Sequence, residues 1–448
     1  MNRLRAVFLL VLIPCLGMGV LTLAGYAQNS WIEGTSGSLN ALIRFAEQEM
    51  KEVDPIARSR AAEALGVLAR PEVAPYLAAA LRDTDCRVRA SAARSLGMMG
   101  GVLAESLMTS LTDWDPNVRG MAATALGDVG YCPAETGLVI RLSDGMPRVR
   151  QAAALALGKL RRTAAVPPLI ALLKDWDARV RASAVHALGE IGDSRAGKPL
   201  LPLVEDGDAK VRAECLLALA KLRRPGVSKI LERRLGDWDA GVRHAAAQAF
   251  GILGDPSGVG SLTLALSDAN ARVRAAAVDA WAQIGDPSGI QNILRLENDW
   301  DPGVRESVAQ ALSSFESAQE AQKALLRLCV DSYASVRTSA IRSIEVSGCV
   351  TGKENLCNAL NDWDGDVRAA AACALGTCRY SKAAGDLITR LQWDPNFRVR
   401  KNAARSLGEL GTPDAIAALR KAIADWNQEV GMEAAAALRS LSSETKHD

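Results

Sequence analysis

Aromatic residues and histidine are scarce in this 448-residue sequence. Phe, Trp and Tyr together make up 4% of the chain, and histidine occurs only three times. Apolar residues nevertheless make up 49%, so the core must consist mainly of Ala, Leu, Val and Ile. This composition favours packed helices over a sandwich or barrel, because strands are enriched in β-branched and aromatic residues.

Catalytic sequence motifs are also missing. The chain contains no G-x-S-x-G, Walker loop, dinucleotide fingerprint, H-E-x-x-H or C-x-x-C. Pairs of carboxylates are frequent, but they recur regularly along the chain and do not single out one site. We expect a protein that is not an enzyme, with no catalytic, cofactor-binding or metal-binding residues.

An excess of basic charge is absent as well. Without residues 1–27 the chain has 51 Lys and Arg, which is 53 minus Arg3 and Arg5, against 51 Asp and Glu. Nucleic-acid binding depends on a basic excess that releases counterions. We therefore expect no nucleic-acid partner.

The N-terminus holds the one long apolar run. Residues 1–27 contain two arginines, apolar residues over 6–24 and a small residue at Ala27, an order typical of a secretory signal cut after Ala27. Two alternatives remain, namely an uncleaved anchor, since 6–24 is long enough to span a bilayer, and lipidation at Cys15. We predict an exported protein, periplasmic or extracellular, that contacts a membrane only through residues 6–24 if they are retained. Residues 28–37 are expected to be a linker.

A repeat of about 31 residues occupies most of the remaining chain. An arginine, usually preceded by valine, returns every 30 to 32 residues. It occurs at Arg58, Arg89, Arg119, Arg150, Arg181, Arg212, Arg243, Arg274, Arg305, Arg337, Arg368 and Arg400, and Gly431 completes the series. This spacing gives thirteen units over residues 38–441, followed by a polar tail at 442–448.

Each unit has the pattern of two helices. In residues 162–193, apolar residues at helical spacing occur before and after the sequence DWD at 175–177. Asp177 is suited to accept hydrogen bonds from the free N–H groups at a helix start, and Gly192 to end that helix in a left-handed conformation. One such pair cannot bury its apolar stripe alone, so we expect the pairs to stack into an all-α solenoid.

The repeated sequence resembles a known family. The pattern D-x-D-x-x-V-R-x-x-A-x-x-A-L-G-x-[IL]-G-D, as in DWDARVRASAVHALGEIGD, is similar to HEAT repeats of the phycobilisome-lyase type. The resemblance implies an α-solenoid of about thirteen two-helix repeats, in a family that includes scaffolds, chromophore-lyase subunits and an iron-dependent hydroxylase. His-Glu pairs hold iron in the hydroxylase, whereas Ala187, Ala245 and Asp448 follow the three histidines here, so that activity is not expected.

A tryptophan stands five residues before the repeat arginine in alternate units. The six residues are Trp114, Trp176, Trp238, Trp300, Trp363 and Trp426, and the units between them carry Thr84, Gly145, Gly207, Ala269 and Ser332 at that position. In the twelfth unit Pro395 takes this position and Trp393 lies two residues earlier. The indoles either pack over their small neighbours and shield the turns from water, or they form an edge that binds a partner or polymer.

Two further features recur or cluster. The row of arginines fits either an anion-binding surface or a structural ladder of ion pairs between units. We expect the ladder, because each arginine has acidic residues four or six positions upstream. Cysteines concentrate at 329–378, where Cys349, Cys357 and Cys378 lie near a unit junction and are suited to a disulfide in an exported protein. Cys215 replaces a packed alanine and is expected to be a buried, inert thiol.

The second helices of related solenoids line the concave side. Seven residues on these helices are candidate contacts there, namely Arg94, His186, Gln248, Asp279, Gln310, Arg342 and Arg405. Their mixed character suits an irregular protein surface. We therefore predict a non-enzymatic protein-binding scaffold of the cell envelope. The alternative is a lyase-like accessory that holds a tetrapyrrole or similar cofactor for attachment to a client protein.

Overall fold

The computed structural model describes residues 43–44, 46, 48–100, 103–315, 318–349 and 351–444. These residues form helices and turns, with no strand among them. The prediction of an all-α solenoid is confirmed, because a short first helix and a longer second helix alternate along the described chain. The expected signal at 1–27, the linker at 28–37 and residues 445–448 lie outside the described part. No helix in that part combines the length and the apolar character needed to span a bilayer.

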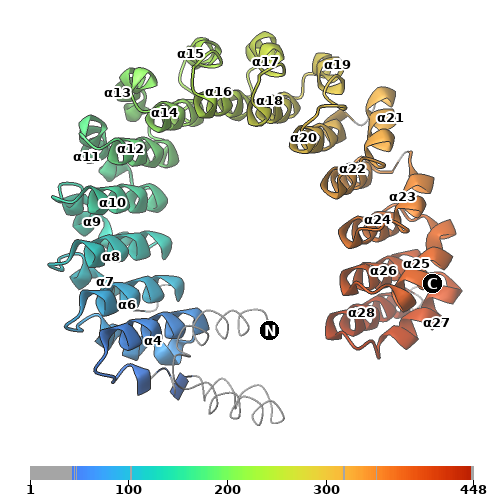
Figure 1. Cartoon of the computed structure of the whole chain (residues 1–448), viewed down its shortest axis with the longest axis horizontal. Coiled ribbons are helices and arrows are strands. Elements are labelled where there is room, and N and C mark those ends of the chain that lie inside the picture. The colour runs from blue at the N-terminus through green and yellow to red at the C-terminus, as the bar shows by residue number, and fades with distance from the viewer. Residues whose placement is uncertain are drawn as a thin grey trace. The chain divides into compact units, whose positions relative to one another are not determined.

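The chain divides into two compact units, Met1–Val227 and Ser228–Asp448, and each is described separately. In the first unit, consecutive second helices pack side by side and each first helix packs against the second helix that follows it (Figure 1). The second helices are α4 (Pro55–Leu68), α6 (Cys86–Met98), α8 (Pro116–Asp128), α10 (Pro147–Leu160), α12 (Ala178–Ile191) and α14 (Ala209–Lys221). The first helices are α5 (Ala74–Ala80), α7 (Ala104–Ser110), α9 (Glu135–Arg141), α11 (Val166–Ala171) and α13 (Gly197–Leu200).

The second unit repeats this arrangement. Its second helices are α16 (Ala240–Leu253), α18 (Ala271–Ile284), α20 (Pro302–Leu312), α22 (Ala334–Val346), α24 (Gly365–Thr377), α26 (Phe397–Leu410) and α28 (Gln428–Glu444). Its first helices are α15 (Val227–Arg234), α17 (Val259–Ala265), α19 (Ile290–Leu294), α21 (Gln319–Leu328), α23 (Lys353–Ala359), α25 (Ala384–Trp393) and α27 (Pro413–Ala422). α28 continues to Glu444, three residues past the predicted end of the repeats.

The helix boundaries follow from capping residues. The Asp177 side chain accepts a hydrogen bond from the N–H of Arg179 at 2.8 Å, and Gly192 ends α12 at φ 75°. Both roles were predicted. The second aspartate of the other D-x-D turns, as in Asp115 and Asp239, caps its helix in the same way. An aspartate or asparagine in the β region therefore fixes where most second helices begin, whereas Met146 and Tyr333 precede α10 and α22 without a capping side-chain bond.

Neighbouring second helices approach closely where glycine meets alanine. A Cβ placed on Gly158 of α10 would lie 2.7 Å from the Ala187 Cα of α12, and one on Gly127 would lie 2.7 Å from the Ala156 Cα. The glycine of the A-L-G sequence is therefore a packing residue whose missing side chain lets two helix backbones touch. The sequence pattern contained this glycine, but its role becomes visible only from the distance.

Two repeats of the second unit use an aromatic residue in the core. Phe250 and Trp281 are fully buried at the position that Leu188 occupies in its repeat. Space for the larger rings comes from Gly258 and Gly289, since a Cβ there would lie 2.3 Å from Phe250 and 2.0 Å from Trp281. Large and small residues thus compensate within the repeat, which keeps the core volume constant.

Candidate functional site

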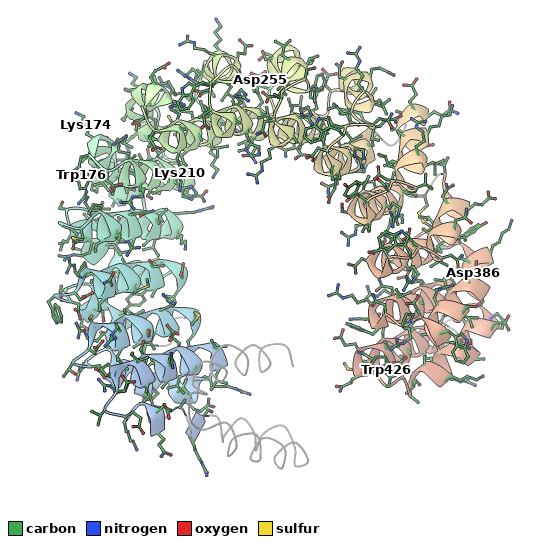
Figure 2. The ribbon with its side chains drawn as sticks, viewed as in Figure 1. Lys174, Trp176, Lys210, Asp255, Asp386 and Trp426 are labelled. Carbon is green, nitrogen blue, oxygen red and sulfur yellow. A yellow bond between two sulfur atoms is a disulfide. The ribbon has the colours of Figure 1, made fainter. Side chains whose placement is uncertain are left out.

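The six predicted tryptophans all lie in the turn between the first and second helix of a repeat. They expose between 74% and 79% of their surface; Trp176 and Trp426 are labelled in Figure 2. These indoles are therefore not part of the buried core, and the interpretation that they pack over their small neighbours and shield the turns stays a prediction. Their role as a partner-binding edge stays a prediction.

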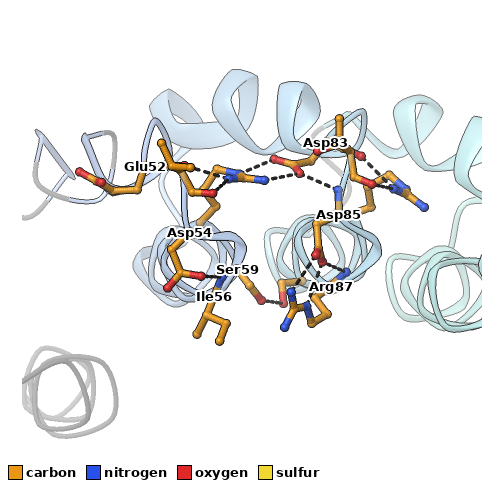
Figure 3. Close-up of polar contacts among 12 residues, drawn as sticks. Glu52, Asp54, Ile56, Ser59, Asp83, Asp85 and Arg87 are labelled. Carbon is orange, nitrogen blue, oxygen red and sulfur yellow. Dashed lines mark hydrogen bonds and ion pairs between the residues drawn. The ribbon is translucent and has the colours of Figure 1, made fainter. Parts of the chain in front are cut away.

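The repeat arginines form the structural ladder that was predicted. In one rung, Arg89 donates from Nε and Nη2 to the Asp113 carboxylate at 2.7 and 2.9 Å. Its Nη1 donates to the carbonyl oxygens of Asp83 and Thr84 in its own turn. The carboxylate that pairs with each arginine therefore comes from the next repeat, so each ion pair links two consecutive repeats. Figure 3 shows the first rung, where Asp83 accepts from Arg58.

The same ion pair recurs in both units. In the first unit the pairs are Arg58–Asp83, Arg89–Asp113, Arg119–Asp144, Arg150–Asp175 and Arg181–Asp206. In the second they are Arg243–Asp268, Arg274–Asp299, Arg305–Asp331, Arg337–Asp362, Arg368–Asp394 and Arg400–Asp425. We call these pairs the Arg–Asp ladder. Its guanidinium groups already donate to a carboxylate and to backbone carbonyl oxygens, as Arg89 does. Few N–H donors therefore remain to bind an anion.

The arginines of the ladder also contact the tryptophan rings. The Arg89 guanidinium carbon lies 5.0 Å from the Trp114 ring centroid, and the corresponding distance from Arg274 to Trp300 is 5.1 Å. Each such ring therefore has one face against a pinned cation and the other face toward solvent. The repeat that supplies Arg89 from α6 has the small residue Thr84 at the position that Trp114 occupies in the next repeat.

The ladder carboxylates are stabilised in their charged form. Burial raises the pKa of Asp113, but the hydrogen bonds from Arg89 and from the Asp115 N–H outweigh it, so that the pKa lies below its ordinary value. The pKa of Asp144 and that of Asp268 are lowered by the same balance. The pKa of Asp83 is also lowered, chiefly by the hydrogen bond from Arg58.

Acid is expected to unfold the protein through the ladder. An unfolded aspartate has a pKa of about 3.9, and the folded values of Asp113, Asp144 and Asp268 lie below it, so the unfolded chain takes up protons first. The stabilisation is therefore present above about pH 4 and is lost as the pH falls through the folded values. Thermal unfolding followed by circular dichroism should show a midpoint temperature that falls as the pH is lowered below about 4. An unchanged midpoint down to pH 2.5 would contradict this.

Replacing one exposed indole should cost little stability. The Arg337 guanidinium carbon lies 5.2 Å from the Trp363 ring centroid, and the indole is otherwise exposed. Trp363→Ala should therefore lower the free energy of unfolding by about 1 kcal/mol or less. Urea unfolding measures the difference. Trp281→Ala, in which the lost indole is fully buried, is the reference for a packed residue. Equal losses in the two variants would show that Trp363 is packed as firmly as a core residue.

The seven predicted second-helix contacts are all on second helices, but several are already engaged. His186 lies 3.1 Å from Glu214 of the next repeat, and this hydrogen bond raises the pKa of His186 although burial lowers it. Arg405 donates to Glu433 at 2.8 Å. Burial raises the pKa of Asp279. The other four, Arg94, Gln248, Gln310 and Arg342, are exposed, although Arg94 lies 3.8 Å from Glu63 and Gln310 donates to Glu306 at 3.5 Å. Their contact with a partner stays a prediction.

The cysteine cluster contains one disulfide. Cys349 and Cys378 are bonded, with their Cα atoms 5.6 Å apart, and they join the ends of α22 and α24 in consecutive repeats. Cys357 remains a free thiol. Cys215 is buried as expected, and its Sγ donates to the Leu200 carbonyl oxygen. Among the described residues, no group of three or more His, Cys, Asp or Glu side chains is arranged to hold a metal ion.

Tyr333 is an exposed turn residue that sequence reasoning missed. It is 54% exposed, and the Arg305 guanidinium lies 5.5 Å from its ring centroid. Tyr333 stands one position after the register of the tryptophans, so a comparison at fixed register passes over it. Trp393, noted only as a displaced residue, is as exposed as the six in register.

Comparison with known proteins supports the repeat. A family model described as HEAT repeats matches residues 43–127, 135–210, 197–263, 259–345 and 354–439. No curated protein matches the chain.

Solved structures show likeness of fold. Kap95 in the Kap95:Nup1 complex has a TM-score of 0.57 and 12% identity, with 91% of this chain and 72% of that chain covered. Kap95p in its RanGDP complex has a TM-score of 0.50 and 15% identity, over 91% and 74%. The complex of CpcE and CpcF of phycocyanin lyase from Nostoc sp. PCC7120 has a TM-score of 0.38 and 23% identity, over 55% and 94%. All three likenesses concern the fold alone.

Proposed function

Because the chain belongs to the HEAT-repeat family, we propose that it is a non-enzymatic protein-binding scaffold exported to the cell envelope. In this role the solenoid presents a fixed row of side chains to a protein partner, and a few anchors supply most of the affinity. The Kap95 structures of the same fold are of complexes with other proteins, Nup1 and Ran.

One observation carries the proposal, namely the exposure of the turn tryptophans. These large aromatic side chains are exposed at the same position of alternate repeats, so they offer a repeated set of contacts to a partner. An arginine lies over the rings of Trp114, Trp176, Trp300, Trp363 and Trp426, and this contact lowers the conformational entropy that binding would cost. Trp and Arg are also the residue types most enriched among interface anchors.

Export is the second part of the proposal, and it rests on the order of charged, apolar and small residues in 1–27. Cell fractionation followed by N-terminal sequencing tests it. We expect the protein outside the cytoplasm with Gln28 as its first residue, or with residues 1–27 retained in the membrane fraction. Recovery from the cytoplasm with residue 1 intact would overturn this part.

Photo-crosslinking in the native cells tests the scaffold role. A photoreactive amino acid is placed at Asn361, an exposed residue beside Trp363, and in a matched control at Ser257, an exposed residue on the opposite side of the repeat between α16 and α17. We expect one protein to be crosslinked from Asn361 and not from Ser257, and to bind the full-length chain after purification. If no protein is crosslinked from Asn361 or from Arg342 on a second helix, the scaffold role is wrong.

A further inference from the structure

Each of the last five repeats carries an exposed aromatic side chain between its two helices or, in the case of Trp393, at the end of the first helix. These residues are Trp300, Tyr333, Trp363, Trp393 and Trp426, with 75, 54, 77, 78 and 79% of their surface exposed. We call them the aromatic row. All five lie in the second unit, in segments that the structure describes.

The ladder shows that the five turns follow one another in a line. Arg305 of α20 binds Asp331 in the turn of the next repeat at 2.7 Å, and Arg337, Arg368 and Arg400 do the same for the three turns after it. Because each rung joins neighbouring repeats, the turns are spaced as stacked helix pairs are, roughly 8–10 Å apart. The aromatic row therefore follows one edge of consecutive repeats, with Tyr333 one position and Trp393 two positions out of register, and it suits an extended partner with a similar period.

Four of the five rings are held in place before any partner arrives. Guanidinium carbons lie 5.1, 5.5, 5.2 and 4.6 Å from the ring centroids of Trp300, Tyr333, Trp363 and Trp426. Each of these guanidinium groups is itself fixed by two hydrogen bonds to a ladder aspartate. One ring face is thus covered by a cation and the other is open to a ligand.

The charge around the row is negative. Apart from the ladder aspartates, the turns at 298–303, 330–335, 361–366, 392–398 and 424–429 carry four carboxylates and one cation. The carboxylates are Asp301, Asp364, Asp366 and Glu429, and the cation is Arg398. Arg398 lies 3.6 Å from Asp366, and Glu429 is paired with Lys401 at 3.0 Å. The surplus of acid favours a basic partner over a nucleic acid or an anionic lipid.

We propose that the aromatic row binds a proline-rich, basic segment of the protein partner in polyproline II conformation. This inference rests on the proposed function and narrows it to one kind of partner. A polyproline II helix has three residues per turn and rises about 3.1 Å per residue, so it presents the same face about every 9 Å, which matches the spacing of the turns. Aromatic-lined surfaces recognise such segments because proline rings stack on them with little loss of entropy. Lys or Arg side chains of the segment would meet Asp301, Asp364 and Asp366.

Titration of the full-length chain with two synthetic peptides tests the proposal. The first peptide repeats Pro-Pro-Arg, and the control repeats Gly-Ser-Arg with equal charge and no polyproline preference. We expect the first peptide to bind at least about tenfold more tightly than the control. A variant with all five aromatic-row residues changed to Ala should lose at least about tenfold in affinity. Changing Trp114 and Trp176 to Ala, in the alternating turns of the first unit, should alter it less than twofold.

The acidic residues are tested separately. Asp301→Asn and Asp364→Asn keep a helix-capping side chain, and with Asp366→Asn they should weaken binding of the Pro-Pro-Arg peptide and reduce its salt dependence. Equal binding of both peptides would show simple charge attraction and overturn the proposal. So would unchanged affinity in the aromatic-row variant, or binding of a neutral oligosaccharide in place of the peptide. If no peptide binds although crosslinking from Asn361 yields a partner, this inference fails while the proposed function stands.

Discussion

Asp299→Ala is expected to lower the free energy of unfolding by about 3–5 kcal/mol, the usual result of removing one partner from a buried ion pair. Asp299 and Arg274 are each only 6% exposed, and the carboxylate accepts from Nε and Nη2 of Arg274 at 2.7 Å. It also accepts the N–H of Asp301 at 2.9 Å. The variant therefore leaves a buried guanidinium without its counter-charge and a helix start without one of its hydrogen bonds.

Urea unfolding followed by circular dichroism measures this loss. Asp366→Ala is the matched control, because its carboxylate is largely exposed and lies 3.6 Å from an exposed arginine. An exposed pair of this kind contributes less than about 1 kcal/mol. Similar unfolding midpoints for the two variants would show that the Arg–Asp ladder does not hold consecutive repeats together.

The second large effect is expected at the glycine–alanine contact between α10 and α12. Gly158→Ala should destabilise the protein by about 1–3 kcal/mol, because the added Cβ would lie 2.7 Å from the Ala187 Cα and 2.9 Å from its Cβ. Backbone atoms cannot move aside as a side chain does, so the two helices must separate.

The same substitution at Gly120 should have the opposite effect on the free energy of unfolding. Gly120 lies inside α8, and a Cβ there would meet nothing within 4 Å, so Gly120→Ala should stabilise the protein by up to about 1 kcal/mol through helix propensity. Thermal unfolding of both variants gives the comparison. If both substitutions stabilise, the close approach of α10 and α12 does not limit the packing of the repeats.

The repeat, the helix caps and the ladder could be predicted from the sequence because their residues recur in register. Asp177 and Gly192 have roles that depend mainly on local backbone geometry, which a sequence pattern carries. The carboxylate that pairs with each ladder arginine was harder to predict from the sequence. The acidic residues upstream suggested it, whereas the structure places the accepting carboxylate in the following repeat, as in Arg119–Asp144.

The position of the indoles relative to solvent could not be predicted in the same way. Alternation of Trp with small residues fits a ring buried over its neighbour and equally a ring lying over an arginine, and only coordinates separate the two. Tyr333 lies one position out of register with the tryptophans, so a pattern aligned on the repeat arginine did not reveal it. The choice of Cys378 over Cys357 as the partner of Cys349 likewise depends on distance rather than spacing.

The most direct test of the account is the affinity of the full-length chain for the protein crosslinked from Asn361, measured by calorimetry. The parent chain is compared with a variant in which Trp300, Trp363 and Trp426 are Ala, after thermal unfolding has shown that the variant is folded. If the ladder presents these indoles to a partner, the variant binds at least about tenfold more weakly while its unfolding midpoint changes little. Equal affinity of the folded variant and the parent would contradict the account.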